Sequence, residues 1–252
     1  IICILTLAVF CSNYIFAQDI ESLQQQLKYI KENTSGAILL NNLAATFYNN
    51  DENDSSKKYA SMALQLADKL LNSDAAKKNT AYNTQCKMIK AEAIENIANA
   101  LSFDDIDKGL DTMQAAMKLR KETGDKKGIA SAYSLIADLY TAKTDYTNAL
   151  KYYDTSLNLY SQAGDTNNTG IGYYHTALAQ RYMGNYGDAL ESNVKALAIG
   201  REVKDTILIT RTLLANGFIY MYVKKFTDAL KSQQEALNIF KATNDSFGIA
   251  NV

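Results

Sequence analysis

The sequence predicts an all-α protein built as an α-solenoid of antiparallel helix pairs, and three observations lead to this fold class. The 252 residues include no proline and only 12 glycines, which is too few turn-forming residues for a sheet-rich fold. Hydrophobic residues make up 47% of the chain, enough for a packed core. A pattern of aromatic and small residues also returns at constant spacing, which indicates stacked structural repeats.

The clearest repeat is an aromatic residue followed three and four positions later by Ala and Leu. It begins at Tyr146, Tyr186 and Phe226, and it therefore recurs every 40 residues. Four dipeptides keep the same spacing and predict the turns between successive helix pairs. They are Gly124-Asp125, Gly164-Asp165, Lys204-Asp205 and Asn244-Asp245.

Small and aromatic residues also hold constant offsets inside each unit. In the first clear unit they are Ala137, Tyr140, Tyr146, Ala149, Tyr153 and Ser156. Small residues allow helices to approach closely, while aromatic rings fill the space between them. From Ile129 to Phe240 these spacings closely resemble the tetratricopeptide repeat (TPR) family. The resemblance implies a right-handed superhelix of helix pairs.

The 40-residue period exceeds the 34 residues usual for this family, so each helix is expected to reach about 16 residues or more. First helices are expected at Lys126–Ala142, Thr166–Met183 and Asp205–Val223, and second helices at Tyr146–Gln162, Tyr186–Val203 and Phe226–Thr243.

Five repeats are expected in residues 18–252, and the two earliest are degenerate copies separated by an insertion near residues 72–80. They cover roughly 37–72, 80–122, 126–162, 166–203 and 205–243, with a sixth starting at 246–252. Solenoids end in a capping helix, and none precedes Val252. A continuation beyond that residue is therefore expected.

The first 17 residues have the pattern of a secretory signal peptide. Residues 1–11 are apolar except for Thr6, and Ala17 provides a small residue before the polar Gln18-Asp19. The apolar run is short for a membrane span. We therefore expect an exported protein on the extracytoplasmic or periplasmic side. The missing initiator Met and basic n-region indicate that the true reading frame starts earlier. A buried first helix or an uncleaved anchor is the alternative.

Residues that could support catalysis are few. Without the leader, Cys86 is the only cysteine, and it is expected to be a small, half-buried packing residue. The only histidine, His175, falls at a packed helix position. No phosphate-binding loop, metal-spaced Cys or His pair, or nucleophile elbow occurs. The sequence therefore predicts no enzyme activity, no cofactor and no metal site in this segment. The net charge of -1 argues against nucleic-acid binding.

The resemblance to the TPR family implies a binding surface, because the first helices of such pairs line a concave face. The matching offsets place nine main candidates on it: Tyr174, Leu178, Arg181, Tyr182, Arg211, Leu214, Phe218, Met221 and Tyr222. An apolar groove with two arginines suits an extended peptide or a partner helix oriented through a carboxylate. The alternative is that neighbouring helices or the chain's own continuation cover this face. The Lys and Asn pattern of chaperone-docking members is not found at these positions.

A leader followed by long-period repeats resembles the extracytoplasmic input region of bacterial membrane-bound signalling proteins. The resemblance implies a protein- or peptide-binding scaffold that acts as a periplasmic sensor, joined to a membrane only through a segment outside this sequence and followed by a kinase, cyclase or DNA-binding output. Two alternatives remain. One is a free-standing periplasmic scaffold for envelope complexes, and the other is an intracellular peptide-pheromone receptor.

Overall fold

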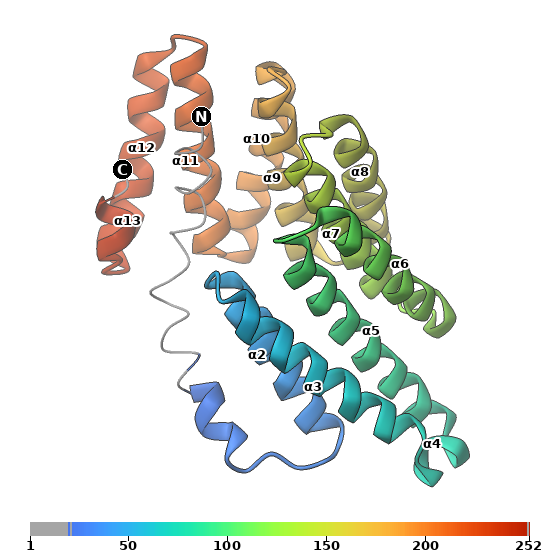
Figure 1. The fold of residues 1–252 in the computed structure, drawn as a ribbon. Coiled ribbons are helices and arrows are strands. Elements are labelled where there is room, and N and C mark those ends of the chain that lie inside the picture. The colour runs from blue at the N-terminus through green and yellow to red at the C-terminus, as the bar shows by residue number, and fades with distance from the viewer. Residues whose placement is uncertain (1–19, 21, 251) are drawn as a thin grey trace. The chain divides into compact units, whose positions relative to one another are not determined.

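The structure, a computed structural model, describes residue 20, residues 22–250 and residue 252, so the expected leader at 1–17 lies outside the described residues. Within the described part the only regular elements are helices (Figure 1). The chain divides into two compact units, residues 1–132 and 133–252, with the boundary inside α7 (Lys126–Ala142). Each unit is described by itself.

Unit 1 contains two helix pairs with a short helix between them, and helical residues 22–27 precede the first pair. Its elements are α2 (Thr34–Asn49), α3 (Asn53–Leu71), α4 (Asp74–Lys78), α5 (Thr80–Ser102) and α6 (Ile106–Thr123), followed by the start of α7. The helices α2, α3 and α5 pack on one another, and α6 packs on α5. The insertion expected near residues 72–80 therefore contains helix α4, which the sequence analysis did not predict.

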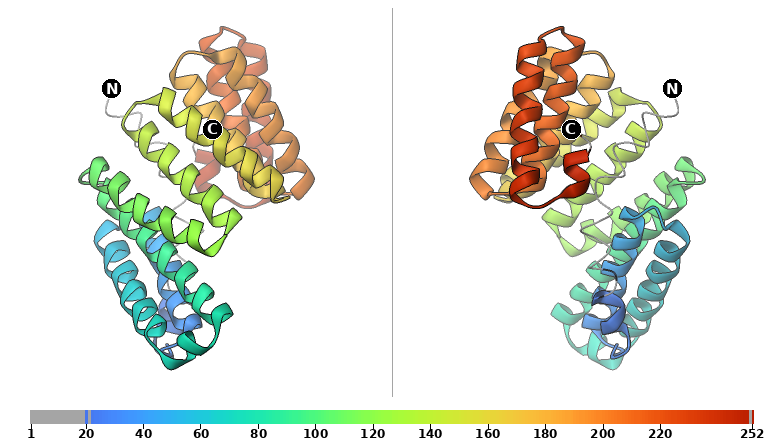
Figure 2. Two further views of the ribbon diagram at one scale, coloured as in Figure 1. Left: turned by 90° about the vertical axis from the view of Figure 1, so that its right-hand side faces the viewer. Right: turned by 90° about the vertical axis from the view of Figure 1, so that its left-hand side faces the viewer.

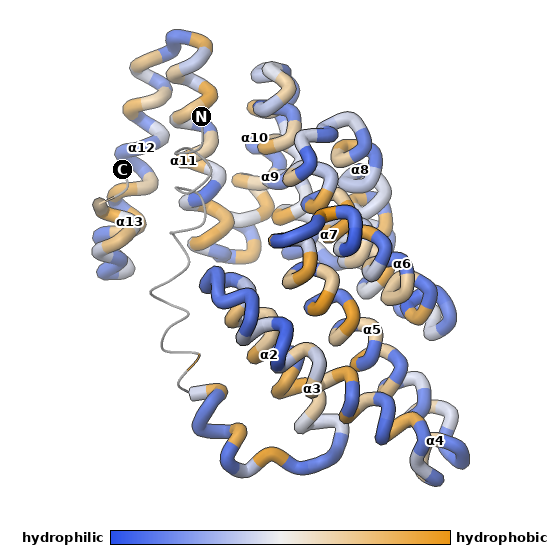
Figure 3. The backbone as a smooth tube through the Cα atoms, in the orientation of Figure 1, coloured by the Kyte–Doolittle hydropathy of each residue, from blue (hydrophilic) through white to orange (hydrophobic). Residues whose placement is uncertain are grey.

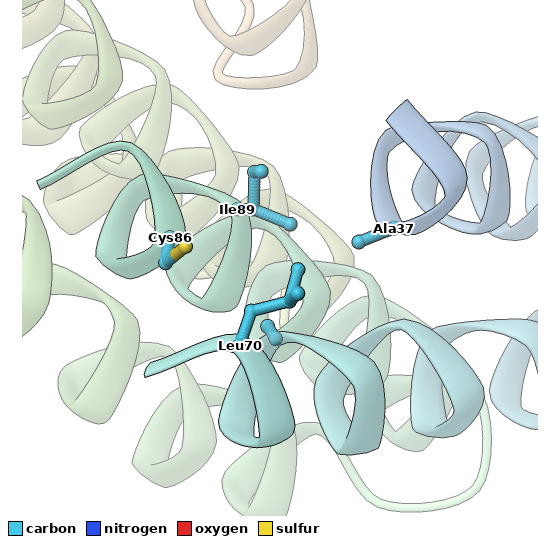
Figure 4. Packing of buried hydrophobic residues seen from close by; sticks show 5 residues of the cluster. Ala37, Leu70, Cys86 and Ile89 are labelled. Carbon is cyan, nitrogen blue, oxygen red and sulfur yellow. The ribbon is translucent and has the colours of Figure 1, made fainter. Parts of the chain in front are cut away.

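The core of unit 1 is made of small and aliphatic side chains from three helices. Ala37 of α2, Leu70 of α3 and Ile89 of α5 meet in one cluster (Figure 4). Cys86 belongs to the same cluster and is completely buried, so the prediction of a half-buried cysteine was wrong. A thiol is small enough to pack between helices, and burial raises its pKa above the usual value.

Unit 2 contains the rest of α7 and the regular repeats. Its further helices are α8 (Tyr146–Gln162), α9 (Thr166–Tyr182), α10 (Tyr186–Val203), α11 (Thr206–Tyr222), α12 (Phe226–Ala242) and α13 (Ser246–Ala250). From α8 onward each helix packs on the next, and α9 also contacts α11 (Figure 2). These antiparallel pairs confirm the predicted fold class. The predicted helix bounds agree with the structure to within a residue.

The small residues of the repeat lie where the helices approach most closely. Ala149, Ala189 and Ala229 are all buried. A Cβ added at Gly170 would lie 2.6 Å from a methyl carbon of Ile199, because α9 and α10 meet there without space for a side chain. Hydrophobic and hydrophilic residues are interspersed along the helices (Figure 3), as expected for helices that each bury one face.

The turns between helix pairs explain the four repeated dipeptides. Their first residues adopt the left-handed conformation, with φ of 66° at Gly124, 64° at Gly164, 59° at Lys204 and 54° at Asn244. The aspartate that follows accepts a hydrogen bond from a backbone N–H in the first turn of the next helix. Asp205 Oδ1 accepts from Leu208 N at 2.9 Å, for example. The dipeptide therefore ends one helix and caps the next.

One contact between helix pairs in unit 2 is polar and buried. Asn193 of α10 donates from Nδ2 to Oδ1 of Asn216 of α11 at 2.8 Å. The two side chains are 0% and 6% exposed. One period earlier the position of Asn193 holds Tyr153, and one period later it holds Gln233. The regular backbone spacing is thus combined with a different side-chain contact at each step.

Candidate functional site

All nine predicted binding residues lie on two neighbouring helices of unit 2, and we call them the α9–α11 surface. Tyr174, Leu178, Arg181 and Tyr182 come from α9, and Arg211, Leu214, Phe218, Met221 and Tyr222 come from α11. Four of these side chains are large, apolar and well exposed. Tyr182 is 45% exposed, Phe218 and Met221 are each 49%, and Tyr222 is 64%. These four side chains therefore expose apolar area to solvent, although α9 and α11 pack on their neighbouring helices.

Arg181 joins the two helices of this surface. Its guanidinium carbon lies 4.7 Å from the ring centre of Tyr182 and 6.0 Å from that of Phe218, so the cation is attracted by two aromatic faces. Within residues 22–250 no carboxylate is close enough to form an ion pair with Arg181. The side chain is half-buried. It is thus a positioned cation whose N–H groups have no anionic partner in this part of the chain.

Two stacked tyrosine pairs fix the rings at the edge of the surface. Tyr146 stacks on Tyr182 with ring centres 5.4 Å apart, and Tyr186 stacks on Tyr222 at 5.6 Å. Each pair joins the start of a second helix to the end of the first helix in the next helix pair, 36 positions later in the sequence. Stacking restricts the rotamers of Tyr182 and Tyr222, which lowers the entropy that a ligand must remove on binding.

A hydrogen-bonded cluster lies beside Tyr174. The Tyr153 hydroxyl donates to Asp138 Oδ1 at 2.5 Å, and His175 Nδ1 lies 3.2 Å from the same oxygen. The edge of Tyr174 packs on the His175 ring. Burial, followed by the Asp138 charge, raises the pKa of Tyr153 well above its usual range, so this hydroxyl stays a donor. His175 is therefore held by a carboxylate, a contact that the sequence analysis did not foresee.

No group of three or more His, Cys, Asp or Glu side chains that could hold a metal ion occurs among the described residues. The helices of the described part include none that is both long and apolar enough to cross a bilayer.

The middle of the chain matches a known protein family in sequence. Residues 128–202 match the sequence profile of the tetratricopeptide repeat family, within the stretch that the sequence analysis compared with this family. No curated protein matches the chain in sequence.

Solved structures share the fold at low sequence identity. BtubC (BKLC) from P. vanneervenii is 16% identical, with a TM-score of 0.62 over 91% of this chain and 89% of that one. Aspartyl phosphate phosphatase F from Bacillus subtilis is 12% identical, with a TM-score of 0.61 over 88% of this chain and 64% of that one.

A Rap protein in complex with competence and sporulation factor is 17% identical, with a TM-score of 0.63 over 91% of this chain and 71% of that one. Identities this low establish only a common fold. Together with the family match, these structures show that the chain folds as helix pairs of the tetratricopeptide type, with the repeat sequence itself recognised at residues 128–202.

Proposed function

We propose that this protein binds a peptide or a segment of another protein on the α9–α11 surface. The observation that supports this most is Arg181, a half-buried cation without an ion-pair partner among the described residues, set between two aromatic rings next to exposed Met221 and Tyr222. Exposed apolar area around one polar anchor is typical of recognition sites on scaffolds.

The cellular role that we propose is that of the extracytoplasmic input region of a bacterial signalling protein. The leader-like pattern of residues 1–17 supports export. Ligand binding would change the packing between helix pairs and pass that change along the chain. The segment itself would carry no catalytic activity. A free-standing periplasmic scaffold would use the same surface without an output domain.

An intracellular peptide receptor is a second candidate, favoured by the similarity to the Rap protein complexed with competence and sporulation factor. The two locations are separated by mass spectrometry of the protein from fractionated cells that express the full gene. A new N-terminus at Gln18 or Asp19 in the extracytoplasmic fraction supports export. An intact N-terminus in the cytosolic fraction contradicts it and favours the receptor.

Binding is tested by selecting displayed random peptides on the immobilised protein and measuring their affinity by fluorescence anisotropy. Phe218→Ala and Tyr222→Ala should each weaken the selected peptides by about five- to thirty-fold. Val194→Ala is the matched control, because Val194 is 63% exposed but lies on α10, a second helix. If the control weakens binding as much as the two test variants, the proposed surface is wrong.

A further inference from the structure

We infer that Arg181 recognises the carboxylate of an internal Asp or Glu side chain in a peptide whose apolar residues lie on both sides of that acid. This inference rests on the proposed function, and it names the chemistry of the ligand.

Of the three other arginines in the chain, two are held by carboxylates, and Arg211 is exposed and has no ring contact within the described residues. Arg120 is hydrogen-bonded to Glu95 and Asp125, and Arg201 pairs with Glu235. The Arg181 guanidinium instead lies over aromatic rings, with its central carbon 4.7 Å from the ring centre of Tyr182 and 6.0 Å from that of Phe218. Stacking occupies the faces of a guanidinium and leaves its N–H edge available. That edge matches the two oxygens of a carboxylate.

The number of cations beside the two rings limits which anion fits Arg181. A phosphate group carries almost two charges and is normally bound by a cluster of cations. In the described residues the only cation with a ring contact to Tyr182 or Phe218 is Arg181 itself. Arg211, the other arginine of the α9–α11 surface, has no such ring contact. One guanidinium therefore lies beside these rings and balances one carboxylate, which favours an acidic peptide over a phosphopeptide.

The apolar residues around Arg181 favour an acidic side chain over a C-terminal carboxylate. Apolar residues lie on both sides of Arg181 along the helices. Half-buried Leu178 lies toward the middle of α9, and half-buried Leu214, which also packs on the core cluster of Ile209 and Phe240, lies toward the middle of α11. Exposed Tyr182 and Tyr222 lie toward the turns. A peptide that ended at Arg181 would leave one of these groups uncovered. A chain that continues past the guanidinium covers both, and it must then present the carboxylate from a side chain.

The test uses the peptides selected on the immobilised full chain. We expect the strongest binders to share one Asp or Glu with apolar residues on each side. In the best binder, Glu→Gln should weaken affinity by about 10- to 100-fold, as expected for loss of a charge-assisted, bidentate hydrogen bond. Selected peptides that require a phosphoserine, or a free C-terminus at this position, would overturn the inference.

Variants of the protein show whether Arg181 is the partner of that acid. Arg181→Met should bind the Glu and Gln peptides equally, and Arg181→Lys should recover only part of the difference because an ammonium lacks the planar fork. Arg201→Met is the matched control, since Arg201 is an exposed arginine on α10, outside the α9–α11 surface, and it should keep the full preference for Glu. Unfolding curves confirm that each variant is folded.

The results distinguish a failure of the proposed binding surface from a failure of the inference about Arg181. If peptides bind and lose affinity in Phe218→Ala but show no preference for Glu over Gln, the surface is a binding site and the inference about Arg181 is wrong. If no peptide is selected, or if the selected peptides bind Phe218→Ala and Tyr222→Ala as tightly as the unaltered protein, the proposed surface itself is wrong.

Discussion

Unit 1 and unit 2 hold their helix pairs together by different means. In unit 1, Arg120 of α6 makes two hydrogen bonds to Glu95 of α5, at 2.9 and 2.8 Å, and a third to Asp125 at 2.7 Å. The Arg120 and Glu95 side chains are only 10% and 6% exposed. In unit 2 the ion pairs of α10, such as Lys195 with Glu191, lie at the surface, and stacked tyrosines join successive pairs.

The two units also differ in how their exposed apolar residues are distributed. Unit 1 satisfies its buried charges internally, and its exposed large apolar residues are scattered, as with Phe103 and Tyr29. Unit 2 places its aromatic residues at repeated positions, so the exposed ones gather along α9, α11 and the start of α12. The residues that stabilise unit 1 therefore differ from those that we propose to bind a ligand in unit 2.

The largest expected effect is in unit 1. Arg120→Met leaves Glu95 and Asp125 buried without their cation, which should lower the free energy of unfolding by about 3–5 kcal/mol. Urea unfolding followed by circular dichroism measures the change. Arg201→Met, which removes the exposed pair with Glu235, should cost less than about 1 kcal/mol. Equal losses in the two variants would show that burial of the ion pair is unimportant.

A steric change in unit 2 should come next in size. Gly170→Ala places a Cβ 2.6 Å from Ile199 Cγ2 and 2.8 Å from Leu208 Cδ2, so the helices must separate at a cost of about 1–3 kcal/mol. Gly187→Ala is the control, because nothing lies within 4 Å of an added Cβ there. It should be neutral or stabilise α10, since Ala has the higher helix propensity. Equal thermal midpoints for the two variants would contradict this account of close packing.

A smaller effect is expected at the turns. Asp205→Ala removes the side chain that accepts from Leu208 N at 2.9 Å, and it should lower the free energy of unfolding by about 1 kcal/mol. Lys225→Ala, at a helix start without a side-chain cap, should change it by less than about 0.5 kcal/mol. A neutral Asp205→Ala would mean that solvent replaces the cap.

The smallest effect is the pH dependence of stability that Glu92 of unit 1 should cause. Burial raises the pKa of Glu92 above its usual value, and although Arg120 opposes this shift, the Glu95 charge adds to it. A carboxyl with a raised folded pKa contributes stability below its unfolded pKa and loses it as pH rises through the folded value. Glu92→Gln should therefore be slightly more stable at pH 7, by under about 1 kcal/mol.

The same variant should lose this advantage as the pH falls toward 4, which urea midpoints across that range would show. Glu202→Gln, at an exposed position of unit 2, is measured over the same range as the control for the substitution itself. A constant advantage of Glu92→Gln at all pH values would point to packing instead of charge.

The sequence was most informative where the repeat is regular. Helices α7 to α12 were predicted to within a residue, because the aromatic-x-x-Ala-Leu pattern and the turn dipeptides mark both ends of each helix. Helix α4 was missed because its five residues, Asp74–Lys78, have no counterpart in other repeats. The Arg120–Glu95 contact was missed because it occurs in a degenerate copy, where the period gives no guide to side chains.

For the candidate site, the sequence predicted which residues share the surface but not how they are arranged. Repeat offsets suffice to place Arg181 and Phe218 on successive first helices. The stacking of Tyr146 on Tyr182 depends on rotamers and on the angle between helix pairs, which a one-dimensional pattern does not contain. The binding role of the nine residues remains a prediction.

The buried Asn193–Asn216 hydrogen bond has a consequence for engineering. Repeat proteins are often treated as modules that can be duplicated, deleted or exchanged. In this chain a deletion of residues 154–193 would place Tyr153 where Asn193 now meets Asn216, and the buried Asn216 amide would lose its partner. The constant backbone period would therefore allow repeats to be exchanged. The asparagine pair does not, because it requires these two repeats to follow one another in this order.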